Sequence, residues 1–288
     1  MRIQHNIMAM NSYRNYNNNT KGLSKNLEKL SSGYKINRAG DDAAGLALSE
    51  KMRAQITGLD AAYKNTKDAT SLIKTAEGAL QEVQDMLNRM VYLAEESANG
   101  VYEDSVDRNA LNDEVTSLRN EINRIADSAN FNGKKLFAEA SNMTANKFQF
   151  QIGDTAASYD QLKMTEALGT TTAALKSLLK GLSTISVASI GVAAQAIETL
   201  KKNDKTSLIN QVSTLRGKLG AVQNRLDHTL NNLSVMKENI QDAESTVRDT
   251  DVAEEMMSYT KNNILIQSAQ AMLAQSNAVP QGVLQLLQ

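Results

Sequence analysis

The chain has 288 residues, a formal net charge of −1, one proline, no cysteine and 4% aromatic residues. The absence of cysteine excludes disulfides, cysteine-ligated zinc and thiol catalysis, and the balanced charge gives no general attraction to nucleic acid. A single proline leaves helices almost uninterrupted. Few aromatic residues suit narrow seams between helices, so the composition favours a mainly α protein with bundle or coiled-coil packing.

The first predicted element is an amphipathic helix. Apolar residues recur at alternating spacings of three and four from Ala9 to Tyr34, and Ile3 and Ile7 begin a second stripe. A helix with two apolar stripes needs more than one partner. The segment has neither a continuous apolar stretch nor a small-residue cleavage site, so we expect no cleaved signal peptide.

Three longer segments carry the same spacing and predict an antiparallel helical bundle. They lie at about 45–98, 105–128 and 205–247. The last has twelve seam positions from Leu208 to Val247, and only Thr229 among them is polar. A period near 3.5 residues kept over this length is typical of coiled coils.

Between the second and third of these segments the pattern changes. "FNGKKLF" at 131–137 contains an Asn-Gly turn, and "NKFQFQIG" at 146–153 alternates between apolar and polar residues. We expect the two to pair as one β-hairpin over about 131–153. Ile185 and Val187 predict a short strand, with a helix after it to Lys202. The stretch 156–190 reads as a short variable connection.

The last predicted element is a helix that begins near Val252. Its apolar residues cover most of the circumference as far as Leu273, which indicates burial on all sides. We expect Pro280 to end this helix, with an apolar final turn that contains Val283, Leu284, Leu286 and Leu287. Six acidic residues and one base lie within 242–255, opposite in sign to the basic N-terminal segment, so the two terminal helices are expected to pair.

Several motifs are similar to those of bacterial flagellins. They are "LSSGYKINRAGDDAAGLALSEKMRAQI" at 30–56, "FNG" at 131–133, "LGAVQNRL" at 219–226, "DTDVAEEM" at 249–256 and "MLAQSNAVPQGVLQLL" at 272–287. The resemblance covers roughly 1–155 and 190–288, which leaves no room for an outer globular domain. It implies an inner terminal-helix domain at 1–44 and 248–288, and a helical-bundle domain at 45–247.

The resemblance implies a structural subunit that polymerises into the extracellular flagellar filament for swimming motility. Its expected partners are other copies of itself, the flagellar export apparatus, an export chaperone, and the filament cap and junction proteins. No cofactor, metal or membrane insertion is expected. The candidate polymerisation residues are Ile3, Ile7, Tyr13, Tyr16, Leu23, Leu27, Leu30, Ile264, Ile266, Leu273, Val283, Leu284, Leu286 and Leu287.

The resemblance also implies recognition by a Toll-like innate immune receptor through the bundle, at Arg89, Leu93 and Glu114. Glu95 and Glu96 depart from the neutral residues common in stimulatory flagellins. Leu93 also lies on the seam spacing, so it fits a core position equally well. An enzyme is disfavoured because no H-E-x-x-H, P-loop or G-x-G-x-x-G motif is present. A hook–filament junction protein with flagellin-like termini and a signalling coiled coil remain as alternatives.

Overall fold

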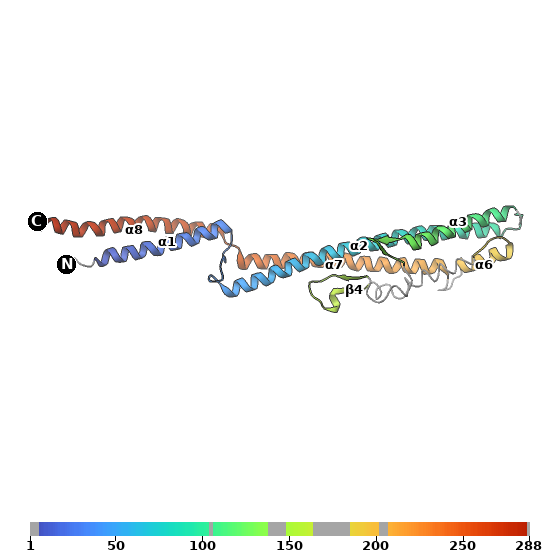
Figure 1. Ribbon diagram of the computed structural model, residues 1–288, viewed down its shortest axis with the longest axis horizontal. Helices are drawn as coiled ribbons and strands as arrows, with labels where there is room; N and C mark the ends of the chain where they lie inside the picture. Colours follow the sequence, from blue (N-terminus) through green and yellow to red (C-terminus); the bar gives the residue numbers. More distant parts are fainter. Residues whose placement is uncertain (1–5, 104–105, 138–147, 164–184, 202–206, 287–288) are drawn as a thin grey trace. The chain divides into compact units, whose positions relative to one another are not determined.

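The computed structural model describes residues 6–103, 106–137, 148–163, 185–201 and 207–286. Within these ranges the chain is mainly helical, which confirms the predicted fold class (Figure 1). The helices are α1 (Ile7–Ser32), α2 (Ala43–Ser97), α3 (Asp107–Ser128), α6 (Ile190–Lys201), α7 (Leu208–Arg248) and α8 (Val252–Leu286). The chain divides into two compact units, unit 1 (Met1–Ile56 with Glu238–Gln288) and unit 2 (Thr57–Lys237).

Unit 2 has a continuous apolar core at the seam between its helices. Within it α2 and α7 run antiparallel, as the ion pairs Asp60–Lys237 and Glu77–Arg216 show. Along most of the seam between α2 and α7, the predicted seam residues of both helices are buried. Side chains of α3 (Asp107–Ser128) and α6 (Ile190–Lys201) also belong to this core. The buried seam residues include Leu72, Ala76, Val83, Met90 and Leu93 of α2 and Leu208, Val212, Leu215, Leu219, Val222, Leu226 and Leu233 of α7.

The β-structure of unit 2 differs from the single hairpin that we predicted. β1 (Asn130–Phe131) and β2 (Lys134–Lys135) pair around a tight turn of their own. Asn132 and Gly133 have φ of 51° and 76°, which is the left-handed geometry of a type I′ turn and so closes a two-residue loop. β3 (Gln149–Gln151) instead pairs with β4 (Gln161–Lys163), past the 3₁₀ turn η1 (Ser158–Asp160).

The strand expected at Ile185 and Val187 does not form. Both residues are buried, but side chains satisfy the backbone of Val187. Its N–H donates to Asn112 Oδ1 at 3.1 Å, and its carbonyl accepts from Ser97 Oγ at 2.6 Å. Because these groups are already paired, the segment needs no neighbouring strand. The helix expected to follow is present as α6.

Unit 1 contains α1 and α8, which lie side by side and run antiparallel (Figure 1). Lys29 and Asn6 of the N-terminal segment contact Glu255 and Ser276 of α8, so the pairing extends along most of α1. The prediction that Pro280 ends the last helix was wrong, because α8 continues to Leu286. No helix in the described part of the chain is long and apolar enough to cross a membrane.

Candidate functional site

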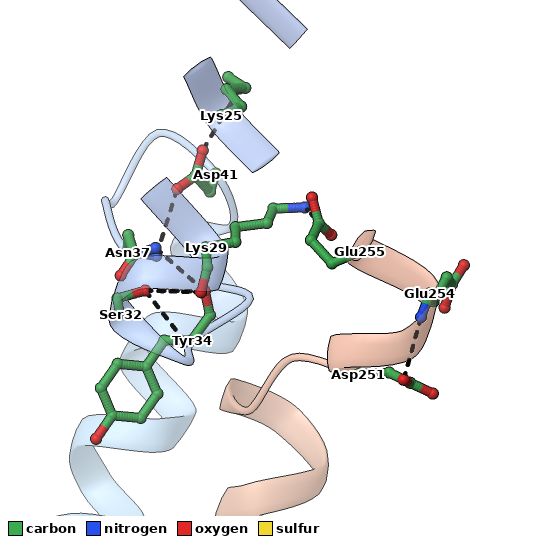
Figure 2. A network of polar contacts seen from close by, with 9 residues as sticks. All are labelled: Lys25, Lys29, Ser32, Tyr34, Asn37, Asp41, Asp251, Glu254 and Glu255. Carbon is green, nitrogen blue, oxygen red and sulfur yellow. Dashed lines mark hydrogen bonds and ion pairs between the residues drawn. The ribbon is translucent and has the colours of Figure 1, made fainter. Parts of the chain in front are cut away.

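Short polar motifs fix where the helices of unit 1 begin and end. Asn6 Oδ1 accepts from the N–H of Ala9 at 3.1 Å and caps α1, and Gly33 ends α1 in the left-handed conformation at φ 77°. Asp251 Oδ1 caps α8 by accepting from the N–H groups of Ala253 and Glu254 (Figure 2). These caps set the lengths of the two helices that pair.

The loop between α1 and α2 is held by Asp41 and Asp42. Asp41 Oδ2 accepts from the N–H of Arg38 at 3.1 Å, and this hydrogen bond is the main reason that the pKa of Asp41 is lowered. Lys25 of α1 lies 3.5 Å from the other Asp41 oxygen (Figure 2). Asp42 Oδ1 caps α2 at Gly45, where a Cβ would lie 2.5 Å from the Asp42 carboxylate. The "GDDAAG" motif is therefore a turn followed by the start of α2.

The chain passes from α7 to α8 beside the end of α1. The carbonyl of Arg248 accepts from the N–H of Lys35 at 2.7 Å, and the carbonyl of Gly33 accepts from the N–H of Thr250 at 3.0 Å. The Arg248 guanidinium lies over the ring of Tyr34, 4.8 Å from its centroid, and donates to Glu50 Oε1 at 2.8 Å. Arg248 thus contacts the segment between α1 and α2 at Tyr34 and Lys35, and the start of α2 at Glu50.

Asn6 connects the start of α1 to α8 at an unusual point. Proline has no N–H, so the carbonyl of Ser276, four residues before Pro280, has no helical donor. Asn6 Nδ2 donates to that carbonyl at 2.8 Å, while Ser276 Oγ approaches Asn6 Oδ1 at 3.4 Å. The N-cap residue of α1 thus supplies the donor that the helix lacks at this carbonyl, and α8 continues past the proline to Leu286.

Unit 1 has almost no apolar core within the described residues. Among the described residues, Ile36 and Ala269 are the only buried hydrophobic residues of this unit, whereas fourteen of its large apolar residues are exposed. The described part of unit 2 buries 31 hydrophobic residues and exposes nine large apolar ones. The exposed large apolar residues in the described part of unit 1 are Ile7, Met8, Met10, Tyr13, Leu27, Tyr34, Leu48, Val252, Met256, Met257, Ile264, Leu265, Met272 and Val279. A surface this apolar marks an interaction site.

The structure places most of the candidate polymerisation residues on this surface or at its edge. Ile7, Tyr13, Leu27 and Ile264 are exposed, Ile264 to 59%. The half-buried candidates are Tyr16, Leu23, Leu30, Ile266 and Leu273. Val283, Leu284 and Leu286 belong to α8, and Ile3 and Leu287 lie outside the described residues.

The candidate set left out several exposed residues of this surface. On α8, Met256, Met257 and Leu265 line a shallow open hollow together with the candidate Ile264. On α1, Met8 and Met10 are both exposed. The signal was present in the sequence, because a helix that is apolar around most of its circumference leaves some apolar residues outside any single seam.

The three candidate receptor residues differ in accessibility. Arg89 Nε donates to Glu114 Oε1 at 2.7 Å on the surface, and the Arg89 guanidinium also lies 5.2 Å from the ring centroid of Tyr92. Leu93 has 0% exposure and belongs to the core of unit 2. Glu95 pairs with Lys201 of α6, and Glu96 accepts from the hydroxyl of Tyr102. The accessible part of this set is therefore the Arg89–Glu114 pair.

No group of three or more His, Asp or Glu side chains in the described ranges is placed to hold a metal ion. His228 of α7 lines an open pocket of unit 2 with Arg225, Asp154 and Asp160. The largest pKa shift among the described groups comes from ion pairing: hydrogen bonds from Lys237 and Lys64 lower the pKa of Asp60 to about 2. That arrangement joins α2 to α7.

Comparison with known proteins identifies the architecture. Residues 3–142 match the family model for the bacterial flagellin N-terminal helical region, and residues 204–287 match that for the C-terminal helical region. The chain belongs to the bacterial flagellin family. It is 47% identical to a flagellin of Bacillus subtilis (strain 168) and 47% identical to one of Halalkalibacterium halodurans, each over the full length of both chains. A Bacillus cereus flagellin crystal structure shares 31% identity, with a TM-score of 0.48, over 59% of this chain and 88% of that one.

Membership of the flagellin family gives the general function. The chain is a structural subunit, not an enzyme, and it self-polymerises into the extracellular filament of the bacterial flagellum, which serves motility. The exposed apolar residues of the terminal helices and the buried core of the bundle are therefore the two features to relate to filament assembly.

Proposed function

We propose that unit 1, at 1–56 and 238–288, contains the filament-core domain expected at 1–44 and 248–288, and that its exposed apolar surface binds neighbouring copies of the chain. The observation that carries this proposal is the contrast between the two units: unit 2 buries its apolar residues in its own core, whereas unit 1 exposes most of them. This contrast supports the assignment of the candidate residues to polymerisation and of the two termini to one inner domain.

The energetics favour assembly through this surface. Burial of one exposed Leu, Ile or Met side chain stabilises a complex by about 1.5–3 kcal/mol. Unit 1 exposes ten such residues together with two Tyr and two Val residues, and burial of this surface can offset the loss of translational and conformational freedom on association. The surface includes residues of both α1 and α8, and an open helical polymer requires contacts between two different faces.

The test is seeded polymerisation of purified monomer, followed by sedimentation and negative-stain microscopy. Wild-type monomer should form long filaments, and Ile264→Ser should raise the critical concentration, since it places a hydroxyl in an apolar contact. Val101→Ser is the matched control, because Val101 is 85% exposed but belongs to unit 2. Wild-type monomer that stays unpolymerised with seeds present would contradict the proposal and favour the hook–filament junction alternative.

We also propose that the chain is exported unfolded by the flagellar export apparatus, with an export chaperone, and adds to the filament beneath the cap protein, with junction proteins at its base. The chain has no disulfide to hinder unfolding. Unit 1 has little core of its own, so it should become fully protected only on assembly. Trypsin should therefore remove both ends of free monomer and leave a core of about 45–245, whereas filaments resist. Equal resistance in both states would contradict this view.

A second proposal concerns the bundle: a Toll-like receptor binds free subunits at the surface that carries Arg89 and Glu114. The observation that supports it is the exposed ion pair between α2 and α3, beside the exposed Tyr92. Arg89→Ala should weaken binding of monomer to the receptor ectodomain. Arg124→Ala is the control, since Arg124 pairs with Glu121 on its own helix. Equal binding by both variants would exclude this surface.

A further inference from the structure

Most of the exposed methionines in the described residues lie on unit 1. Nine of the twelve methionines lie in the described residues, and six of those nine are exposed. Five of the six belong to unit 1: Met8, Met10, Met256, Met257 and Met272. The sixth is Met236 of unit 2, whereas Met90 in the core of unit 2 has 0% exposure.

Thioethers are the main oxidisable groups of this protein, because the chain has no cysteine and no tryptophan. Hydrogen peroxide transfers one oxygen atom to the sulfur: its O–O bond breaks, the sulfur loses two electrons, and methionine sulfoxide and water form. The reaction follows exposure. Met257, at 68% exposure, should therefore react much faster than Met90.

We propose that Met8, Met10, Met256, Met257 and Met272 are sites of reversible oxidation by peroxides, and that their sulfoxides block self-assembly of the free subunit. The proposal rests on the proposed role of unit 1 as the assembly surface. A sulfoxide replaces a flexible apolar side chain by a polar one, and a polar group buried without a partner costs free energy. Oxidation thus converts an apolar contact into an unfavourable one.

The positions of these methionines make the effect local. Met256 and Met257 line the hollow on α8 together with Ile264, Leu265, Thr260 and Lys261, so a sulfoxide there places a polar group in the apolar part of its lining. Met8 and Met10 lie in the first turn of α1. The core of unit 2 has its own methionines, Met86 and Met90, on its inner face. Peroxide should leave the bundle folded and change only what unit 1 can bind.

The experiment treats monomer with hydrogen peroxide, maps sulfoxides by peptide mass spectrometry and measures the critical concentration for seeded polymerisation. We expect oxidation at the five sites and a rise of about tenfold or more for each sulfoxide that assembly buries. Treatment with the two methionine sulfoxide reductases, one for each epimer, should restore assembly. The same methionines should resist peroxide in preassembled filaments.

The controls separate this proposal from the proposed function. A variant with all five methionines changed to Leu should polymerise after peroxide treatment, whereas Met236→Leu should protect nothing. If the five-site variant fails to assemble before treatment, reductase rescue of wild-type monomer provides the test. Unchanged assembly of monomer oxidised at the five sites would overturn the proposal. Untreated wild-type monomer that does not polymerise would instead count against the function proposed for unit 1.

Discussion

At the scale of single residues, side chains that pair with backbone groups decide how the terminal helices meet. Asn6 uses its oxygen to cap α1 and its amide nitrogen to satisfy the carbonyl of Ser276. The sequence rule that a proline ends a helix rests on a missing N–H and a clash with the preceding turn. Here a residue 270 positions away supplies the donor. Reading α8 alone could not reveal that partner.

This arrangement predicts coupling between Asn6 and Pro280. Asn6→Asp keeps the oxygen that caps α1 but loses the donor to the Ser276 carbonyl, so it should destabilise the α1–α8 pair by about 1–2 kcal/mol. Pro280→Ala returns a helical N–H to that carbonyl, and in this background Asn6→Asp should cost much less. The thermal dissociation of filaments measures each effect, and equal costs in both backgrounds would show that the hydrogen bond has no such role.

Asp60 gives a pH-dependent prediction at the same scale. The folded pKa of Asp60 is about 2, below its ordinary value of 3.8. Its ion pairs therefore stabilise the bundle fully above pH 3.8, and this stabilisation is lost as the pH falls toward 2. Wild type should therefore have a higher Tm than Asp60→Asn at neutral pH, and the difference should shrink over that window. The difference should be small, since Asp60 and Lys237 are partly exposed.

Calorimetry across this pH range checks the effect. Glu82→Gln changes another exposed carboxylate of α2 and serves as the control. A Tm difference between wild type and Asp60→Asn that stays constant down to pH 2 would mean that the pairs with Lys64 and Lys237 do not set the acid response.

At the scale of secondary structure elements, patterns that repeat over many turns predict the structure better than short ones. The seam of α7 was predictable because burial repeats over many turns, so single irregularities such as Thr229 do not change the period. The prediction of a strand at Ile185 and Val187 was wrong, because Asn112 of α3 and Ser97 of α2 form hydrogen bonds with the backbone of Val187. Long-range pairing of this kind leaves no periodic signal.

The β-strands and the candidate site show the same limit. "FNGK" encodes its own turn through Asn132 and Gly133, but nothing in 146–153 identifies Gln161–Lys163 as the partner strand. For the site, spacing identified the apolar stripes of α1 and α8. It could not tell which of their residues the antiparallel partner covers, because that depends on a register fixed by contacts such as Lys29–Glu255.

The contrast between helix seams and helix surfaces predicts two separate mutational effects. Leu226→Ala, at a fully buried position of α7, should lower the free energy of unfolding of unit 2 by about 2–5 kcal/mol. Ile264→Ala, at an exposed position of α8, should leave that free energy within about 0.5 kcal/mol of wild type and weaken polymerisation. Urea unfolding with amide hydrogen exchange in α7 measures the first effect, and seeded sedimentation measures the second. A similar loss of unit 2 stability in both variants would contradict this division.

At the scale of the whole molecule, we propose that stability and assembly belong to different parts of the chain. Unit 2 has a continuous apolar core of its own, and unit 1 holds the surface that we assign to neighbouring copies. Such a division allows the bundle of a free subunit to stay folded while its terminal helices are not yet bound to neighbouring copies. It also means that a change in the terminal helices should alter the polymer without altering the bundle.

Removal of residues 280–288 tests this division most directly. The segment contains the end of α8 and four apolar residues, Val283, Leu284, Leu286 and Leu287. Without it unit 2 should keep its helical circular dichroism signal and its urea midpoint, because none of its core residues lies in the segment. Polymerisation should be lost, since both the apolar side chains and the last turns of α8 are missing.

A matched variant separates these two causes. Changing the four apolar residues to Gln keeps the length of α8, because Gln favours helix nearly as well as Leu, and removes only the apolar surface. If apolar burial drives assembly, the Gln variant should fail to sediment as filaments, as the truncated chain does. If the Gln variant polymerises and the truncated chain does not, the length of α8 is what assembly requires. A truncated chain that still forms filaments would place the essential contacts before Pro280, on the exposed faces of α1 and α8 that the structure describes.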